Sequence, residues 1–395
     1  MTSEWNHFAL GEITELVIDY RGKTPRKLGG DWCKQGYRAL SAKNIKTGRI
    51  VQAETIRYID ESLYRKWMKD EVQRGDILIT SEAPFGQIFF WDSDEKIVLS
   101  QRLFCVRIKP EYDARFIYYY MTTPEFQSEL DGRATGTTVI GLRQPELMKC
   151  IIRCPEIQEQ KAIAAILSSI DAKIIANEKV NDNLEQQAAS IFAEWLNTCA
   201  DFSTIGDMAH NILDYSPIAS EKIRLLNSSD ITEGVFPVAP LVPNKDLKGH
   251  FKKRFQFGDI LYSEIRPRNH HYGVVLFDAS DYIASTRLMV IRAIENKVSP
   301  AMLYQYLLLP EVEAEFTLKT ESRSGTFPQG NYADMASIQV PYSPTDSQTA
   351  VSETLSQIRY TIAQNQLESQ RLAELRDTLL PKLMSGELDV SAVQL

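Results

Sequence analysis

The sequence predicts an α+β protein in which one unit occurs twice, each copy being a globular α+β domain followed by a long helix. Three observations predict this fold class: segments that recur in order, short apolar runs separated by turn residues, and two long heptad patterns. We place the first globular domain at residues 1–154 and the first long helix at 155–200. The second globular domain is placed at 201–342 and the second long helix at 343–395.

The repeat is visible as matched segments that keep their order along the chain. LSAKNIKTG (40–48) recurs as LNSSDITEG (226–234), and RGDILITSE (74–82) recurs as FGDILYSE (257–264). Later pairs are LSQRLFCVRI (99–108) with ASTRLMVIRA (284–293), and IYYY (117–120) with LYQY (303–306). Copies of this length are domains rather than solenoid modules. Two equivalent but diverged surfaces are typical of a protein that grips its ligand twice.

Each globular domain is expected to combine short strands with short helices. The runs DILIT, QIFFW, IVLSQRLFCVRI and GVVLF are rich in β-branched and aromatic residues and are bounded by Gly, Pro and Asp, which is typical of strands between turns. Residues 114–130 predict a short helical stretch that ends and restarts around Pro124. Residues 300–316 predict the same around Pro310.

The two long helices are predicted from apolar residues spaced by three and four, which form a heptad seam. In the first helix they are Ile163, Leu167, Ile170, Ile174, Leu184, Ala188, Ile191 and Trp195. In the second they are Val351, Leu355, Ile358, Ile362, Leu372, Leu379 and Leu383, after Ser343 as N-cap and Pro344 as first helical residue. Forty helical residues extend for about 60 Å. Because a globular domain lies between the helices, we expect them to pair as an antiparallel coiled coil.

Asn177 and Asn365 occupy the same position of the seam in the two copies. A buried polar seam residue costs stability but fixes register and partner, since misaligned pairing leaves its amide unsatisfied. The alternative is that each Asn lies at a solvated edge. Their matched positions favour the first interpretation, so we predict that both set the coiled-coil register.

The charge of the chain is segregated, although its net value of −8 taken alone argues against a nucleic-acid partner. Residues 21–49 hold nine Lys/Arg and one acid, and residues 245–271 hold seven Lys/Arg and three acids. Residues 156–196 instead hold three Lys and seven acids. A single basic run is most often a solvated face, but a run that recurs in both copies favours a polyanion ligand.

Composition also bounds the class of protein. A hydrophobic content of 44% is that of an ordinary globular chain. The polar start and the absence of a long apolar run predict a cytoplasmic protein without a membrane segment. The cysteines have no counterparts in the second copy, so we expect reduced thiols rather than a repeated disulfide or zinc site; they are Cys33, Cys105, Cys150, Cys154 and Cys199.

No catalytic constellation is found, so we predict no catalytic residues, no metal and no cofactor in this chain. The sequence lacks a P-loop, a GxGxxG after a strand, an Asn-Pro-Pro-aromatic methyltransferase motif and a deaminase motif. His270 and His271 form a loop pair without an obvious third metal ligand. Asp76 and Asp259 of the repeated GDIL segment are interpreted as turn aspartates that cap backbone amides, not as general bases.

The residues instead fit a basic, loop-rich reader of nucleic acid, in which Arg and Lys contact phosphates and polar side chains read base edges. Arg102 and Arg287 of the repeated S-x-R-L segment are candidates, and a structural salt bridge is an equally good interpretation. The glycines of the later loops either let backbone approach a phosphate or merely serve turns. The full set of predicted DNA-binding residues is Arg21, Lys23, Arg26, Lys27, Lys43, Arg49, Arg102, Arg133, Arg143, Lys252, Lys253, Arg254, Arg266, Arg268, His270, Arg287 and Arg323.

The chain resembles the specificity subunit of Type I restriction–modification systems. The residues that carry this resemblance are the LGEI and IGDM starts (10–13 and 205–208) and the paired GDIL turns. The most specific are CPEIQEQKAIAAILSSIDAKI (154–174), which opens the first long helix, and LAELRDTLLPKLMSGEL (372–388), which closes the second. The resemblance covers essentially the whole chain, while the domain interiors depart from any fixed pattern.

The resemblance implies a non-catalytic subunit that binds double-stranded DNA. Each globular domain would be a target-recognition domain for one half of a bipartite site, with the unread spacer set by the coiled coil. The helices would dock two methyltransferase subunits, which carry S-adenosylmethionine and methylate adenine. Restriction endonuclease/translocase subunits would then join this complex. Two other hypotheses are a coiled-coil adaptor that binds only proteins and an enzyme acting on nucleic acid.

Overall fold

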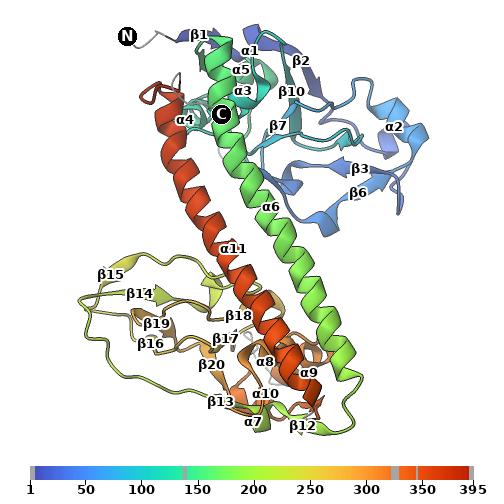
Figure 1. Ribbon diagram of the computed structural model, residues 1–395. Helices are drawn as coiled ribbons and strands as arrows, with labels where there is room; N and C mark the ends of the chain where they lie inside the picture. Colours follow the sequence, from blue (N-terminus) through green and yellow to red (C-terminus); the bar gives the residue numbers. More distant parts are fainter. Residues whose placement is uncertain (1–4, 137–139, 322–328, 344–345, 391–395) are drawn as a thin grey trace. The chain divides into compact units, whose positions relative to one another are not determined.

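The computed structural model describes residues 5–136, 140–321, 329–343 and 346–390 (Figure 1). The chain divides into two compact units. Unit 1 comprises Met1–Ala172 with Ala373–Leu395, and unit 2 comprises Lys173–Leu372. Each unit therefore contains one globular domain together with part of both long helices. This division cuts across the linear order of domain, helix, domain, helix that the sequence suggests.

Unit 1 is built on a four-stranded antiparallel sheet and a second, three-stranded sheet. The order of the first is β2 (Thr14–Asp19), β10 (Leu103–Ile108), β7 (Ile77–Thr80), β8 (Ile88–Phe90). The order of the second is β6 (Arg57–Ile59), β3 (Tyr37–Leu40), β9 (Val98–Leu99). Two small ladders complete the unit: β1 (Asn6–Ala9) with β11 (Ile151–Cys154), and β4 (Ile45–Lys46) with β5 (Arg49–Ile50).

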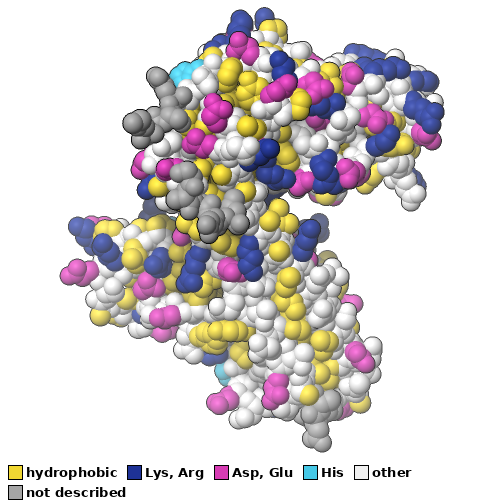
Figure 2. All heavy atoms as spheres, turned by 45° about the horizontal axis from the view of Figure 1, so that its top comes forward, with side chains coloured by type: hydrophobic (Ala, Val, Ile, Leu, Met, Phe, Trp, Pro, Cys, Tyr) yellow, Lys and Arg dark blue, Asp and Glu magenta, His cyan; other side chains and the backbone are white. Residues whose placement is uncertain are grey.

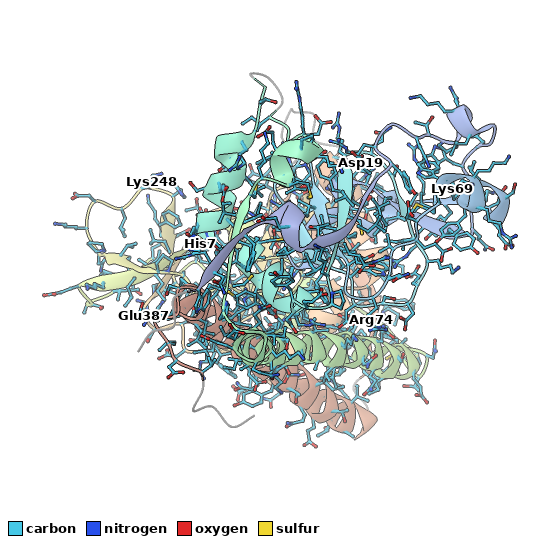
Figure 3. All side chains as sticks on the ribbon, turned by 90° about the horizontal axis from the view of Figure 1, so that it is seen from above. His7, Asp19, Lys69, Arg74, Lys248 and Glu387 are labelled. Carbon is cyan, nitrogen blue, oxygen red and sulfur yellow. The ribbon has the colours of Figure 1, made fainter. Side chains whose placement is uncertain are left out.

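The helices of unit 1 cover these sheets and enclose its core. They are α1 (Leu10–Ile13), α2 (Glu61–Trp67), α3 (Ala114–Met121), α4 (Pro124–Arg133) and α5 (Gln144–Leu147). Helix α3 packs its buried aromatic face between the first sheet and the long helices, with Phe116 fully buried and Tyr119 nearly so. A separate cluster around Trp67 and Trp91 lies between the two sheets and α2. Seen from above, His7 on β1 and Lys69 just after α2 lie at opposite sides of this domain (Figure 3).

Unit 2 repeats this arrangement. Its first sheet has the order β13 (Ala209–Asn211), β20 (Leu288–Ala293), β17 (Ile260–Ser263), β18 (Tyr272–Val274). The second has four strands, β15 (Leu241–Pro243), β14 (Lys222–Leu226), β19 (Tyr282–Ser285), β16 (Phe251–Lys253). β12 (Phe202–Thr204) pairs with β21 (Gln339–Pro341), and the helices are α7 (Ile205–Met208), α8 (Pro300–Leu307), α9 (Pro310–Glu321) and α10 (Tyr332–Ala336).

The predicted repeat is thus a repeat of topology. The second sheets of the two units correspond through one parallel strand pair each, β3 with β9 in unit 1 and β14 with β19 in unit 2. In these pairs Leu40 lies opposite Leu99, and Leu226 lies opposite Ala284. The predicted helix breaks at Pro124 and Pro310 are confirmed, since α4 and α9 begin at these prolines. One difference stands out. Strand β16 pairs with β19 in unit 2, whereas β9 is the edge strand of the corresponding sheet in unit 1.

The long helices are α6 (Ile157–Leu196, 40 residues) and α11 (Asp346–Met384, 39 residues). They pack antiparallel, because successive contact positions run forward along α6 and backward along α11. In unit 2, Glu185 contacts Arg359 and Asn177 contacts Glu368; in unit 1, Asp171 contacts Arg376. The predicted α+β fold with a coiled coil is therefore confirmed.

The seam residues bury as the heptad pattern predicts. Ile163, Leu167 and Leu355 are fully buried. The prediction of Ser343 as N-cap involves residues 344–345, which lie outside the described residues. The Ser343 hydroxyl accepts hydrogen bonds from the amides of Ala200 and Asp201, at the entry to the second globular domain. Within the described part of the chain, no helix has the length and apolar content needed to cross a membrane.

Candidate nucleic-acid interface

The frame of both domains is held by the aspartate of the repeated GDIL segment. Asp76 is 1% exposed and forms two hydrogen bonds with the Arg107 guanidinium, at 2.8 and 2.9 Å. Asp259 is fully buried and forms the same pair with Arg292, at 2.6 and 2.8 Å. Each carboxylate also accepts a backbone amide three residues before it. These aspartates are structural residues, as the turn interpretation predicts.

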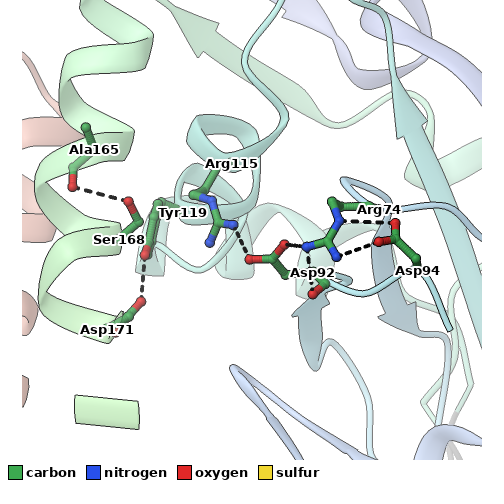
Figure 4. A network of polar contacts seen from close by, with 8 residues as sticks. All are labelled: Arg74, Asp92, Asp94, Arg115, Tyr119, Ala165, Ser168 and Asp171. Carbon is green, nitrogen blue, oxygen red and sulfur yellow. Dashed lines mark hydrogen bonds and ion pairs between the residues drawn. The ribbon is translucent and has the colours of Figure 1, made fainter. Parts of the chain in front are cut away.

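A second polar network fastens the globular domain of unit 1 to its long helix (Figure 4). Arg74 pairs with Asp92 and Asp94, and Arg115 pairs with Asp92. The hydrogen bond from Arg115 lowers the pKa of Asp92, and that from Arg74 lowers the pKa of Asp94. On α3, the Tyr119 hydroxyl donates to Asp171 of α6 at 2.6 Å, and burial raises the pKa of this tyrosine.

The repeated S-x-R-L segment lies beside the loop that follows each GDIL strand. The Arg102 carbonyl accepts the Ser81 amide, and the Arg287 carbonyl accepts the Glu264 amide, both at 2.9 Å. The Arg102 side chain pairs with Glu82 at 3.1 Å. The Arg287 side chain donates to Gln329, which in turn donates to Glu264. Both arginines therefore have a structural partner while remaining solvent-exposed.

Unit 1 contains a polar groove beside this segment. Its volume is about 380 Å³, and we call it the β9 groove because it lies next to the end of that edge strand. It is lined by Trp32, Ala39, Ser41, Ala42, Lys43, Asn44, Thr55, Arg57, Ala83, Ser100, Gln101 and Arg102. The lining holds three cationic side chains and no carboxylate. A groove of this composition favours an anionic or acceptor-rich ligand.

Two of these cations have no neutralising partner. Lys43 and Arg57 are exposed, and among the described residues no carboxylate pairs with either of them. The Arg57 guanidinium lies over the Trp32 ring, 5.2 Å from its centroid. Two non-glycine residues of the lining, Ala83 (φ 42°) and Arg102 (φ 65°), adopt left-handed backbone conformations. Such strained residues cluster at binding sites and other functional positions.

Unit 2 is different at the corresponding place. Ser229 stands where Lys43 stands in the matched segment. The His250 carbonyl, just before β16, accepts the amide of Thr286, the counterpart of Gln101. The edge that is open in unit 1 is therefore covered in unit 2.

The cations of unit 2 gather in the loop between β17 and β18. Arg266 (φ 48°) and His270 (φ 54°) are left-handed, as Ala83 is in the shorter loop of unit 1. Arg268 pairs with Glu321 at 3.1 Å. His270 lies between Glu233 and Glu313, at 2.9 and 2.8 Å, and the hydrogen bond with Glu233 is the main cause of its raised pKa. We call residues 265–271 the β17–β18 loop.

A larger cavity in unit 2, of about 480 Å³, lies between α11 and the strands around Tyr282. Its two arginines are neutralised: Arg224 pairs with Asp281, and Arg359 pairs with Glu185. Its walls are largely aromatic and aliphatic, including Phe236, Phe277 and Tyr304. This cavity therefore lacks the free positive charge that a nucleic-acid site requires.

Several predicted DNA-binding residues are used inside the protein. Arg21 pairs with Asp19 and lies over Phe104, and Lys23 donates to the Trp67 carbonyl, its pKa lowered by burial. Arg133 pairs with Glu129 and Arg254 donates to the Ser280 carbonyl. Lys253 is 4% exposed, and its ammonium donates to the Leu288 carbonyl at 2.7 Å. The structure therefore corrects the placement of Lys253, which lies inside the domain rather than on a binding surface.

The other predicted residues lie on the surface. Lys27 donates to the Gly22 carbonyl at 2.9 Å. Arg323 falls outside the described residues. The remaining exposed set is Arg26, Lys43, Arg49, Arg102, Arg143, Lys252, Arg266, Arg268 and Arg287, with His270 half-buried. Lys and Arg side chains gather at the upper right in Figure 2, on unit 1, with acidic side chains among them.

Sequence reasoning missed three residues of the β9 groove: Trp32, Arg57 and Gln101. Arg57 lies just beyond the basic run that ends at Arg49, and Trp32 and Gln101 carry no charge. The pairing of β3 with β6, where Ala39 lies opposite Arg57, brings these segments together. Of these three residues, only Gln101 could have been suspected from the sequence, because it lies within the repeated S-x-R-L segment.

The seam asparagines lie between the two helices. Asn177 is 4% exposed, and its amide donates to Glu368 at 2.8 Å and to Ser369 at 3.2 Å. The Asn365 amide donates to Asn181 at 2.8 Å. The two loop histidines have other partners: His271 contacts the Ile231 carbonyl at 2.6 Å, while His270 contacts carboxylates. Among the described residues, no group of His, Cys, Asp and Glu is arranged to hold a metal ion.

Comparison with known proteins identifies the family. The model of the Type I restriction modification DNA specificity domain matches residues 2–186 and 204–376. The Type I restriction enzyme HindI specificity subunit of Haemophilus influenzae is 32% identical over 179 residues, covering 45% of this chain and 39% of that protein. The MjaIX specificity subunit of Methanocaldococcus jannaschii is 24% identical over 340 residues, covering 80% and 78%.

The fold is shared with a solved structure. The Type I restriction–modification S subunit from M. genitalium has a TM-score of 0.60 to this chain, 16% sequence identity, and coverage of 96% of both chains. The resemblance drawn from the sequence is confirmed, since the family model matches both copies of the repeat. The chain therefore belongs to the Type I restriction–modification DNA specificity family and carries its specificity domain twice.

Proposed function

We propose that this chain is the non-catalytic specificity subunit of a Type I restriction–modification complex and binds a bipartite site in double-stranded DNA. One observation carries the proposal. The two domains share one framework but place exposed cationic side chains on different elements, the β9 groove in unit 1 and the β17–β18 loop in unit 2. Two readers of two different half-sites require this combination of shared frame and diverged surface.

The long helices are proposed to hold the two half-site readers at a fixed separation and to dock the catalytic partners. A 40-residue helix extends for about 60 Å. Its acidic composition favours protein partners, because phosphate would be repelled. These partners are two methyltransferase subunits, which bring S-adenosylmethionine, and the restriction endonuclease/translocase subunits. Half-site spacing that follows protein geometry is general for twofold readers.

The proposal is tested by selection from a random duplex DNA library, using the full chain assembled with the methyltransferase subunits of its host. We expect two short conserved blocks separated by a spacer without sequence preference. Affinity should fall steeply with salt, because phosphate contacts release counterions. An adaptor that binds only proteins would show no enrichment and no salt-dependent DNA affinity, and this result would refute the proposal.

A further inference from the structure

We propose that the β9 groove reads a base of the first half-site, with Arg57 as the reading side chain and guanine as its base. The inference rests on the proposed function and adds to it a named residue and a chemical class of contact. It starts from Lys43 and Arg57, the two groove cations that no carboxylate of the described residues neutralises. A guanidinium can address a base edge through two parallel hydrogen bonds, whereas an ammonium acts as a flexible point charge.

Arg57 is held ready for such a contact. It lies on β6, the edge strand next to β3, and its guanidinium lies over the Trp32 indole. Stacking on an aromatic face limits the orientations of the guanidinium plane and leaves its N–H groups free at the rim. Among the described residues, no carboxylate competes for these N–H groups. Two aligned donors match the O6 and N7 acceptors of guanine in the major groove.

The other polar residues of the groove have different roles from that of Arg57. Lys43, which also lines the groove, supplies a mobile charge suited to a phosphate, which contributes affinity without sequence information. Arg102 is already paired with Glu82 and is therefore less available. Gln101 is exposed and also lines the groove. Because unit 2 adds β16 beside β19, the counterpart of β9, and has Ser229 in place of Lys43, this contact belongs to the first half-site only.

The test compares the selected DNA sites of complexes assembled with wild-type chain and with the variants Arg57→Ala, Arg57→Lys and Lys43→Ala. In Arg57→Ala we expect one guanine of the first half-site to lose its preference by about 10- to 100-fold, since a bidentate pair supplies this discrimination. Arg57→Lys should lose most of the same preference, because it keeps the charge but not the geometry. Lys43→Ala should weaken all sequences alike and lower the salt slope by about one.

Two controls separate this inference from other outcomes. Arg65→Ala removes an exposed arginine of the same domain, paired with Glu61 on α2, and should leave the site unchanged. The second half-site, read by unit 2, reports in every variant whether the chain is folded and assembled. If Arg57→Ala or Arg57→Lys keeps full guanine preference, or weakens all sequences uniformly, the reading role is refuted. Failure of the wild-type complex to select two blocks would refute the proposed function itself.

Discussion

At the scale of single residues, each domain contains one aspartate that is almost completely buried and paired with an arginine. Asp76 is 1% exposed, and its partner Arg107 has a side chain that is 18% exposed. Breaking a buried pair leaves one charge without a partner and costs about 3–5 kcal/mol. The same argument holds for Asp259 and Arg292 in unit 2. These aspartates hold each GDIL turn in place, and with it the start of the strand, β7 or β17, that leads to the loop beside the S-x-R-L segment.

We therefore expect Asp76→Ala to lower the free energy of unfolding by about 3–5 kcal/mol, measured by urea denaturation. The matched control is Asp94→Ala, because Asp94 is 83% exposed and pairs with Arg74 at the surface. This control should unfold at nearly the wild-type urea concentration. Equal stability of the two variants would contradict the structural role of Asp76.

His270 gives the β17–β18 loop a dependence on pH. Its ring is held by Glu233 and Glu313, and Tyr272 lies nearby with ring centroids 5.9 Å apart. The hydrogen bond with Glu233 is the main cause of the raised pKa of His270. A raised pKa in the folded state means that the stabilisation is fully present below the unfolded value, about 6.5, and is lost as the pH rises through the folded value.

We predict that the NMR titration of His270 has its midpoint above about 6.5, the ordinary value for histidine, and that Glu233→Gln moves this midpoint downward. Protection of the β17–β18 loop in hydrogen exchange should decrease as the pH rises through the same midpoint. A midpoint at or below the ordinary value would contradict the Glu–His–Glu arrangement.

At the scale of elements, a periodic sequence pattern correctly predicted which residues are buried. Sites formed by segments that are far apart in the sequence were not predicted. The heptad spacing correctly predicted the buried seam residues Ile163 and Leu355, because helical periodicity fixes which face is buried. Lys253 was wrongly predicted to lie on a DNA-binding surface, because that prediction considered only its charge. In β16 the side chains alternate between the two faces, so Lys252 is exposed while Lys253 is buried. The β9 groove escaped prediction because its lining comes from segments joined only by strand pairing.

The coiled coil itself contains a buried charge that can be tested. Arg359 of α11 has a side chain that is 4% exposed and pairs with Glu185 of α6. Its guanidinium also lies over Tyr304, 4.9 Å from the ring centroid. Removal of Glu185 would leave this guanidinium buried without its carboxylate. The pair therefore ties the helices of unit 2 to each other and to α8.

We expect Glu185→Ala to destabilise the protein by about 3 kcal/mol, seen as a lower urea midpoint. The control is Lys173→Ala, since Lys173 and its partner Glu368 are each about half exposed and such a pair contributes little. The role of Asn177 and Asn365 in setting register stays a prediction. If Glu185→Ala and Lys173→Ala have the same effect, the buried position of Arg359 is contradicted.

At the scale of the whole molecule, the proposed function makes the length of the helices a determinant of the DNA site. Helix α6 is continuous through the point where unit 1 ends and unit 2 begins, at Ala172 and Lys173. Seven inserted residues lengthen a helix by about 10.5 Å, which corresponds to about three base pairs at 3.4 Å each.

We expect that inserting one heptad into both α6 and α11 at the unit boundaries lengthens the unread spacer by about three base pairs. Both half-sites should keep their sequences, because neither recognition surface changes. Sequencing of methylated sites in cells that express the variant complex measures both quantities. A heptad inserted into α6 alone is the control and should lower assembly, since the seam is then out of register. An unchanged spacer would refute the helices as the determinant of spacing.

The ion pairs of the coiled coil have a further consequence for a chain that carries the same helix twice. By the repeat, Asp171 of α6 corresponds to Arg359 of α11, so matched positions bear opposite charges. Their partners, Arg376 and Glu185, correspond to Ala188 and Ala373. Two copies of α6 from different molecules would leave Asp171 facing alanine, and two copies of α11 would do the same to Arg359. These ion pairs therefore favour α6 paired with α11 over two copies of the same helix, which disfavours association of newly made chains through like helices.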